Sequence, residues 1–175
     1  MRLFIAINFD SNTIKAIMDI QGRLRQFGKG NFTRQGNLHL TLAFLGEVEP
    51  IKAESVKEIM DDLTIETIQL QFNRVGKFTR GDEYTYWLGL EKNNTLSQLQ
   101  HELTSKLKSS GFNIDSRKFS PHITLARRMI LHSSPDSSSL LSAPFGTTVN
   151  KISLMRSHYI DGLLTYTKQY EVYCR

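Results

Sequence analysis

The feature that most constrains the fold is a short motif that occurs twice. Residues 38–43 read Leu-His-Leu-Thr-Leu-Ala and residues 121–126 read Pro-His-Ile-Thr-Leu-Ala, so the two histidines stand 83 residues apart in a chain of 175. Side chains alternate between the two faces of a β-strand, so each copy has an apolar face and a face with histidine, threonine and alanine. We expect the apolar face to pack in the core and the other face to form the floor of a cleft. Two such strands half a chain apart indicate two related lobes that face each other.

The remaining residues predict helices and strands in a mixed order. Apolar residues at helical spacing after N-capping residues or proline predict helices that follow Asp10, begin at Pro50 and follow Asn93. Alternating or aromatic-rich runs predict further strands at 2–8, 65–75, 84–90, 149–159 and 163–173. Glycine and polar residues predict turns at 28–31 and 77–82 and a mobile loop at 132–139. Because hairpins occur among the helices, the order predicts an α+β fold and not a doubly wound parallel sheet.

The composition narrows the class of protein. Its 22 basic and 17 acidic residues give a net charge of +5, which favours an anionic partner such as nucleic acid. No run approaches the roughly 20 apolar residues of a membrane span, so no membrane association is expected. The single Cys174 cannot form an internal disulfide, which is consistent with the cytoplasm. The length suits one domain, residues 1–175.

A facing pair of histidines can serve as an acid and a base. The ordinary imidazole pKa of about 6.5 lets one ring be protonated while the other is neutral. One ring can take a proton from an attacking water while the other gives a proton to a leaving oxygen, which suits in-line displacement at phosphorus. Thr41 and Thr124, on the same faces, would hold the non-bridging oxygens. Arg127 would add positive charge, although strand alternation starts it on the face opposite His122.

Other interpretations start from the same residues. Zinc and two-metal phosphoesterase sites use three or more ligands, often carboxylates, and no Asp, Glu or Cys lies on these strand faces, so neither a metal nor another cofactor is expected. A basic chain with an inert cleft would be an RNA-binding module. RNA ligation, as the reverse chemistry at the same site, is a third hypothesis. Tyr86 and Trp87 are candidates for base stacking, although aromatic residues on strands more often belong to the core.

The chain resembles the bacterial and archaeal RNA 2′,3′-cyclic phosphodiesterases, historically labelled 2′-5′ RNA ligases, of the two-histidine phosphoesterase superfamily. The resemblance covers nearly the full length and rests on segments 2–7, 37–48, 86–89 and 121–127, with Ser157, Gly162 and Tyr166 in a closing segment. It implies a bilobal α+β fold of two pseudo-symmetric lobes, each of mostly antiparallel sheet with outer helices. It also implies an active-site cleft between the lobes that needs no metal.

The resemblance further implies hydrolysis of a terminal RNA 2′,3′-cyclic phosphate to a 2′-phosphate. His39 would be the proton donor to the leaving 3′-oxygen, and His122 would be the proton acceptor that acts on water. Thr41 and Thr124 would bind the phosphate. The symmetry of the motif gives no independent reason to choose between the two histidine roles.

The closing segment adds Ser157 and Tyr166 as candidates for substrate binding, and a monomer is expected. The chain departs from many relatives at two positions. Asn31 stands where they carry an arginine, and Arg156 stands where they often carry an acidic residue. Both differences affect how the substrate is bound and which substrate is preferred.

Overall fold

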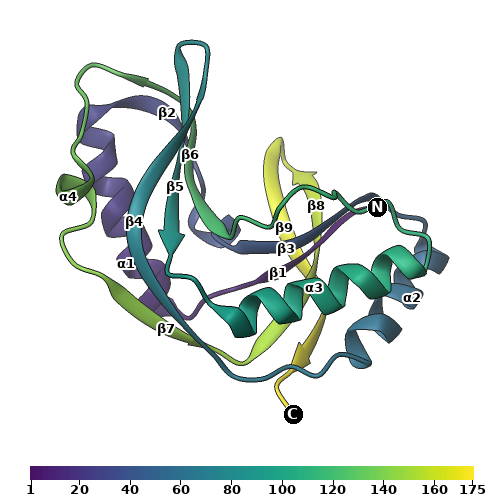
Figure 1. Cartoon of the computed structure of the whole chain (residues 1–175). Helices are drawn as coiled ribbons and strands as arrows, with labels where there is room; N and C mark the ends of the chain where they lie inside the picture. The colour runs from purple at the N-terminus through teal and green to yellow at the C-terminus, as the bar shows by residue number, and fades with distance from the viewer.

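The computed structural model describes the whole chain, residues 1–175, as nine strands and four α-helices (Figure 1). The strands are β1 (Arg2–Ile7), β2 (Gly28–Phe32), β3 (Leu40–Glu47), β4 (Ile68–Arg80), β5 (Glu83–Leu90), β6 (His122–Leu131), β7 (Phe145–Val149), β8 (Lys151–Ile160) and β9 (Leu163–Tyr173). The helices are α1 (Ser11–Leu24), α2 (Pro50–Asp61), α3 (Asn94–Ser109) and α4 (Ser137–Leu140). None of the four is both long and apolar enough to cross a lipid bilayer.

The three longer helices begin where the sequence predicts. The Asp10 carboxylate accepts a hydrogen bond from the backbone N–H of Thr13 at 2.8 Å. The Asn93 side chain accepts one from the backbone N–H of Leu96 at 2.9 Å. Pro50 is the first residue of α2. These residues suit helix starts because the first N–H groups of a helix have no partner within it.

All nine strands belong to one antiparallel sheet, which divides into two halves. The strand order is β7-β4-β5-β6-β3-β1-β8-β9, and β2 pairs with the outer part of β6. The first half is β3-β1-β8-β9, and the second half is β6-β5-β4-β7 with β2. The halves meet where β3 adjoins β6, through the pair Leu40 and Ile123. The predicted bilobal α+β fold of mostly antiparallel sheet is confirmed.

The two halves exchange helices. Helix α1 follows β1 of the first half but packs against β6, and α3 follows β5 of the second half but packs against β3 (Figure 1). The Gln21 amide of α1 donates a hydrogen bond to the Leu125 carbonyl at 2.9 Å, and the Gln100 amide of α3 donates one to the Leu42 carbonyl at 3.3 Å. Each carbonyl lies three residues after a histidine of the repeated motif. The same kind of contact therefore fixes both histidine strands.

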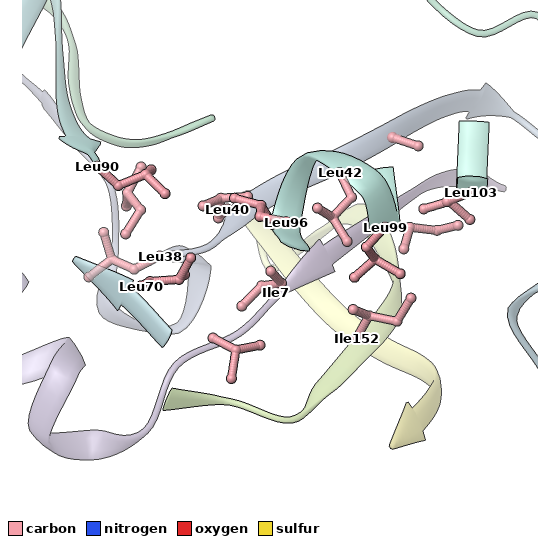
Figure 2. Close-up of a cluster of buried hydrophobic side chains, with 14 of the residues drawn as sticks. Ile7, Leu38, Leu40, Leu42, Leu70, Leu90, Leu96, Leu99, Leu103 and Ile152 are labelled. Carbon is pink, nitrogen blue, oxygen red and sulfur yellow. The ribbon is translucent and has the colours of Figure 1, made fainter. Parts of the chain in front are cut away.

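The apolar residues of the repeated motif lie in the core, as predicted. Leu38, Leu40 and Leu42 are at most 3% exposed, and Ile123 and Leu125 are fully buried. Figure 2 shows that Leu40 and Leu42 lie next to leucines of α3, namely Leu96, Leu99 and Leu103. Because adjacent strand residues alternate in direction, the histidines and threonines of the motif lie on the face of the sheet away from this core.

The structure differs from the predicted elements in three places. Residues 28–31, predicted as a turn, form strand β2 against β6. The hairpin turn predicted at 77–82 shortens to Gly81 and Asp82 because β4 stays paired with β5 up to Arg80. The loop predicted at 132–139 contains the start of the short helix α4, which is anchored by the buried Leu140 and followed by the unpredicted strand β7.

Candidate active site

The two histidines lie next to each other at the junction of the halves. His39 immediately precedes Leu40, and His122 immediately precedes Ile123. Leu40 and Ile123 are paired with each other across β3 and β6. In an antiparallel pair, one step along one strand is one step back along the other. His39 therefore stands opposite Thr124, and His122 stands opposite Thr41. The four polar residues of the repeated motif thus form one patch on the open face of the sheet.

Both imidazoles are oriented in the same way. His39 Nδ1 lies 2.7 Å from the Asn37 carbonyl oxygen, and His122 Nδ1 lies 2.8 Å from the Ser120 carbonyl oxygen. A carbonyl oxygen only accepts hydrogen bonds, so in each ring Nδ1 carries a proton and donates it. Nε2 is then the nitrogen left for chemistry in the cleft. His39 Nε2 lies 2.9 Å from the Thr41 hydroxyl oxygen.

Aromatic side chains flank each histidine. The His39 ring lies 4.9 Å from the Phe4 ring and 5.3 Å from the Tyr166 ring, measured between ring centres. The His122 ring lies 5.8 Å from the Phe78 ring and 6.5 Å from the Trp87 ring. Each pair consists of one residue from the adjoining inner strand and one from a hairpin strand farther out. The packing restricts the rings to one orientation and covers part of each with apolar surface.

The surroundings disfavour a proton on His39 Nε2. Burial lowers the pKa of His39 below the ordinary imidazole value, the hydrogen bond to the Asn37 carbonyl raises it in part, and the positive charge of Arg127, together with that of His122 whenever its ring is protonated, lowers it further. The free protein therefore favours neutral His39, in which Nε2 accepts a hydrogen bond from Thr41. An anion placed among these groups would counter the positive charges and favour the protonated ring.

Asn37 connects the His39 strand to the β8–β9 hairpin. Its side-chain amide donates a hydrogen bond to the Leu164 carbonyl at 2.9 Å, and its side-chain oxygen accepts one from the Tyr166 N–H at 3.2 Å. Its own carbonyl holds the His39 ring, as described above. One buried residue therefore fixes both His39 and the tyrosine that packs against it.

Arg127 lies in the cleft, against the expectation from simple alternation. The pairing of β5 with β6 skips Leu125, which makes a β-bulge. Leu125 and Ala126 are both buried, so the next residue, Arg127, returns to the face of His122 and Thr124. The expectation that Arg127 must reach around from the opposite face was wrong because the bulge shifts the alternation by one residue.

The first half contains the same bulge. The pairing of β1 with β3 skips Leu42, and Leu42 and Ala43 are both buried. Phe44, which is 45% exposed, then returns to the cleft face. Phe44 precedes Arg127 by the same 83 residues that separate the two histidines. The two side chains are therefore equivalent positions of the two halves.

A cavity of about 930 Å³ opens from this patch over the first half of the sheet. Five of the candidate residues from the sequence line it: His39, Thr41, Arg127, Ser157 and Tyr166. His122 and Thr124 do not line it, and they lie beside it on β6, across the junction. Arg156, one of the two departures from relatives, also lines the cavity. The second departure, Asn31, lies on β2 and pairs with Arg127.

Sequence reasoning missed the aromatic surroundings of the histidines. No role was predicted for Phe4 or Phe78, and Asn37 was seen as part of the motif without a function. Tyr86 is 4% exposed and belongs to the core, as expected for a strand aromatic, whereas Trp87 is half-buried and lies beside His122. The signal for Trp87 was its alternation with Tyr86, because adjacent strand residues face opposite ways.

Metal-binding groups do not converge anywhere in the chain. No three side chains among His, Cys, Asp and Glu are grouped so that they would hold a metal ion. The side chains grouped in the cleft are instead imidazoles, hydroxyls and guanidiniums. Groups of these three kinds can bind an anion, and imidazoles can also exchange protons with it.

Known proteins resemble this chain over most of its length. A family model described as the 2′-5′ RNA ligase superfamily matches residues 10–159. The RNA 2′,3′-cyclic phosphodiesterase of Methanocaldococcus jannaschii is 34% identical over 129 residues, which are 73% of this chain and 71% of that protein. The RNA 2′,3′-cyclic phosphodiesterase of Escherichia coli K12 is 29% identical over 172 residues, which are 95% of this chain and 92% of that protein.

Solved structures extend the likeness to the fold. Escherichia coli LigT complexed with 3′-AMP has a TM-score of 0.84 at 28% identity, and the match covers 99% of this chain and 97% of that chain. TT0787 of Thermus thermophilus has a TM-score of 0.83 at 22% identity, covering 100% of this chain and 98% of that chain, which is a likeness in fold alone. The arrangement of strands and helices is thus shared from one end of the chain to the other.

Proposed function

The chain belongs to the 2′-5′ RNA ligase superfamily, and on this premise we propose that it is a hydrolase that opens the 2′,3′-cyclic phosphodiester at an RNA end to a 2′-phosphomonoester. The observation that carries the proposal is the matched pair of imidazoles, each with Nδ1 donating to a backbone carbonyl, which leaves Nε2 for the chemistry of the cleft. Relatives at about 30% identity carry the name of this activity. We also propose that residues 1–175 act as one bilobal domain, because each half supplies one histidine.

The reaction needs one proton removed and one proton supplied. His122 Nε2 takes a proton from water as the water oxygen attacks phosphorus. The bond from phosphorus to the 3′-oxygen breaks, and His39 Nε2 gives its proton to that oxygen. The bond to the 2′-oxygen stays intact, so the product carries a 2′-phosphate and a 3′-hydroxyl. Family resemblance supports this assignment of donor and acceptor.

Hydroxyl and guanidinium groups would hold the phosphate during this exchange. Thr41 and Thr124 stand opposite the two histidines and would donate hydrogen bonds to the non-bridging oxygens. Arg127 would balance the negative charge that builds on them in the transition state. Ser157 and Tyr166, which line the cavity, would contact the nucleotide.

The lowered pKa of His39 fits a general acid that becomes protonated only when the substrate binds. A bound phosphate brings negative charge next to His39, Arg127 and His122, so the pKa of His39 rises when the substrate arrives. The proton donor is then formed in the complex that uses it. No metal takes part in this scheme, because the imidazoles and the guanidinium supply the proton transfer and the positive charge.

Ligation is a second candidate reaction, because the His122 side carries aromatic rings on which a nucleoside could stack. Trp87 and Phe78 lie beside His122, and their ring centres are 5.5 Å apart. A nucleoside stacked there would present its 5′-hydroxyl in the place of the attacking water, and the product would be a 2′-5′ linkage. This reaction would show as a joined product when two short RNAs are supplied.

The test is incubation of a short RNA that ends in a 2′,3′-cyclic phosphate with the protein in excess chelator, followed by identification of the terminal phosphate. We expect a 2′-phosphate, with turnover lowered about 10²- to 10⁴-fold in His39→Ala and in His122→Ala. His101→Ala, on the exposed side of α3, is the control and should keep full activity.

Three results would contradict the proposal. A 3′-phosphate product would overturn the assigned leaving group. Full activity in either histidine variant would overturn the mechanism. Unchanged RNA would favour a binding module, which should then bind RNA in a salt-sensitive way without product.

A further inference from the structure

The cavity beside His39 extends farther than a cyclic phosphate requires. It runs from His39 and Thr41 along β1 and β3 to Phe44 and Arg2 near the start of the chain. Arg2 lies on the cleft face of β1, two residues before Phe4, which packs on His39. The length from His39 to Arg2 is more than one phosphate fills, so the far end is free for another part of the substrate.

Arg2 is held in place without being neutralised. Its guanidinium carbon lies 4.9 Å from the centre of the Phe44 ring. Glu47 is its partner across the β1–β3 pair, but the Glu47 carboxylate lies 3.4 Å from the N-terminal ammonium group of Met1 instead. Arg2 itself forms no ion pair and no side-chain hydrogen bond. A guanidinium that is stacked on a ring and lacks an acidic partner is suited to bind an anion.

The symmetry of the halves gives Arg2 a counterpart. Phe44 occupies in the first half the position that Arg127 occupies in the second, and the Arg2 guanidinium lies on Phe44. The cleft thus receives Arg127 from the second half and, besides Arg156, Arg2 from the first half. The guanidinium groups of Arg127 and Arg2 both act on Tyr166. Burial raises the pKa of the Tyr166 hydroxyl, and the charges of Arg127 and Arg2 lower it in part. The two cations therefore share one cavity.

In-line chemistry decides which part of the substrate lies near Arg2. The 3′-oxygen leaves toward His39 and water arrives from the side of His122, so the ribose must lie on the His39 side. The chain of the RNA continues from the 5′-oxygen of that ribose. The cavity over the first half is the space on that side. Arg2 is four residues from Ala6, which pairs with Thr41, and four residues of strand span roughly 13 Å.

We propose that Arg2, stacked on Phe44, binds the phosphate that joins the terminal nucleotide to the rest of the RNA. The proposal rests on the proposed function for the direction of the substrate. It makes Arg127 the ligand of the terminal phosphate and Arg2 the ligand of the next phosphate along the chain. The protein then prefers the end of an RNA chain to a free cyclic mononucleotide.

A binding measurement tests the subsite without relying on catalysis. Adenosine 2′,5′-bisphosphate carries both phosphates, and adenosine 2′-monophosphate lacks the 5′-phosphate. By calorimetry, we expect the unaltered protein to bind the bisphosphate about tenfold more tightly, as one charge-assisted contact provides. Arg2→Gln should lose this preference while it binds the monophosphate as before. Arg2→Lys, which keeps the charge without the planar stacking group, should retain part of it.

The chain offers a matched control. The Arg25 guanidinium carbon lies 4.2 Å from the centre of the Phe32 ring and does not line the cavity. Arg25→Gln removes the same charge and the same kind of stacked pair, so it should keep the tenfold preference. For RNA oligonucleotides, Arg2→Gln should also reduce the slope of log affinity against log salt by about 0.7, as expected for one lost phosphate contact.

The outcomes separate this proposal from the proposed function. Equal affinity of the unaltered protein for both nucleotides, a preference that survives in Arg2→Gln, or an equal loss for both nucleotides in that variant would each overturn the subsite. A preference that Arg2→Gln removes, in a protein that hydrolyses no cyclic phosphate, would support the subsite and reject the proposed function. With activity present, Arg2→Gln should raise KM for a cyclic-ended RNA and leave KM for a cyclic mononucleotide unchanged.

Discussion

Leu40 and Ile123 are paired across the middle of the sheet, and this pair joins the two halves of the molecule. Both side chains are fully buried. This pair fixes the register of the two strands. His39 and His122, each one residue before its member of the pair, therefore lie on the same open face of the sheet. A slip of one residue in either strand would turn its histidine and threonine toward the core. The buried pair therefore sets the geometry of the candidate active site.

Asn37→Ala is expected to uncouple His39 from the β8–β9 hairpin. The substitution leaves the Asn37 carbonyl in place but removes the two side-chain hydrogen bonds to the backbone of Leu164 and Tyr166. The Tyr166 N–H then loses its side-chain partner and the Leu164 carbonyl keeps only the exposed Arg34, so the free energy of unfolding should fall by about 1–3 kcal/mol. It should also lower kcat more than it raises KM and shift the pH profile, because the ring packed on His39 moves. Urea unfolding and steady-state kinetics over pH measure both effects.

Arg34→Gln is the control for Asn37, because Arg34 donates to the same Leu164 carbonyl from an exposed position, at 3.2 Å. Its loss should cost less than about 1 kcal/mol. An unchanged pH profile in Asn37→Ala, together with lower stability, would mean that Asn37 has a structural role alone.

Arg127→Gln is expected to raise the pKa of His39. Burial lowers the pKa of His39 most, and the positive charge of Arg127 adds to this, so removing the charge moves the pKa toward its ordinary value. Added inorganic phosphate should also raise the pKa of His39 in the unaltered protein and raise it less in Arg127→Gln. Titration of the imidazole Cε1–H signal by NMR measures both shifts.

Arg128→Gln removes the same charge one residue away and serves as the comparison for Arg127→Gln. Arg128 does not line the cavity, and its charge is not among the causes that shift the pKa of His39. If both variants shift His39 equally, the effect comes from net charge and not from the position of Arg127.

The sequence predicted the repeated architecture because the same physical pattern occurs twice. Each copy of the motif separates apolar from polar residues with a period of two, and this pattern placed Leu40 in the core and His39 on the open face. It placed the Arg127 side chain on the wrong face of the strand, because a β-bulge changes the alternation and depends on the partner strand. The bulges at Leu42 and Leu125 appear in the pairing of strands, which a single strand's pattern does not contain.

Strand β2 shows a second limit of sequence reasoning. Gly28 and Gly30 resemble turn residues because glycine has a low preference for strands. In the structure a Cβ atom at Gly28 would collide with the Ile130 carbonyl, and one at Gly30 would collide with the Met129 side chain. These glycines permit a close approach of β2 to β6 and not a turn. Only the three-dimensional arrangement reveals this reason for their presence.

Gly76→Ala is expected to displace Trp87 from its place beside His122. Gly76 is the partner of Trp87 across β4 and β5, and a Cβ atom there would overlap the indole ring. We expect a loss of about 1–3 kcal/mol of stability, as for an overpacked site, and a changed fluorescence of the single tryptophan. Gly22→Ala is the control, because its Cβ would meet open space on helix α1, and it should raise stability by about 0.5–1 kcal/mol. An unchanged emission spectrum in Gly76→Ala would show that the indole does not rest on this glycine.

Glu171→Gln is expected to change how the stability of the β8–β9 hairpin depends on pH. Burial alone would raise the pKa of Glu171, but hydrogen bonds from Tyr173, Lys168 and Ser153 and the charge of Lys151 outweigh it and lower the pKa to about 2. A carboxyl whose pKa is lower in the folded state stabilises the fold above its ordinary value of 4.5, and this contribution is lost as the pH falls toward 2.

The variant should therefore lose about 1–2 kcal/mol of stability at pH 7, and the difference from the unaltered protein should shrink steadily below pH 4.5. Urea unfolding at pH 7, 4.5 and 3 measures this dependence. Glu66→Gln, at an exposed position without an ion pair, should leave stability nearly unchanged at all three values. A constant difference between Glu171→Gln and the unaltered protein over this range would show that the carboxylate charge does not stabilise the hairpin. Because β9 carries Tyr166, the same loss at low pH should loosen the ring that packs on His39.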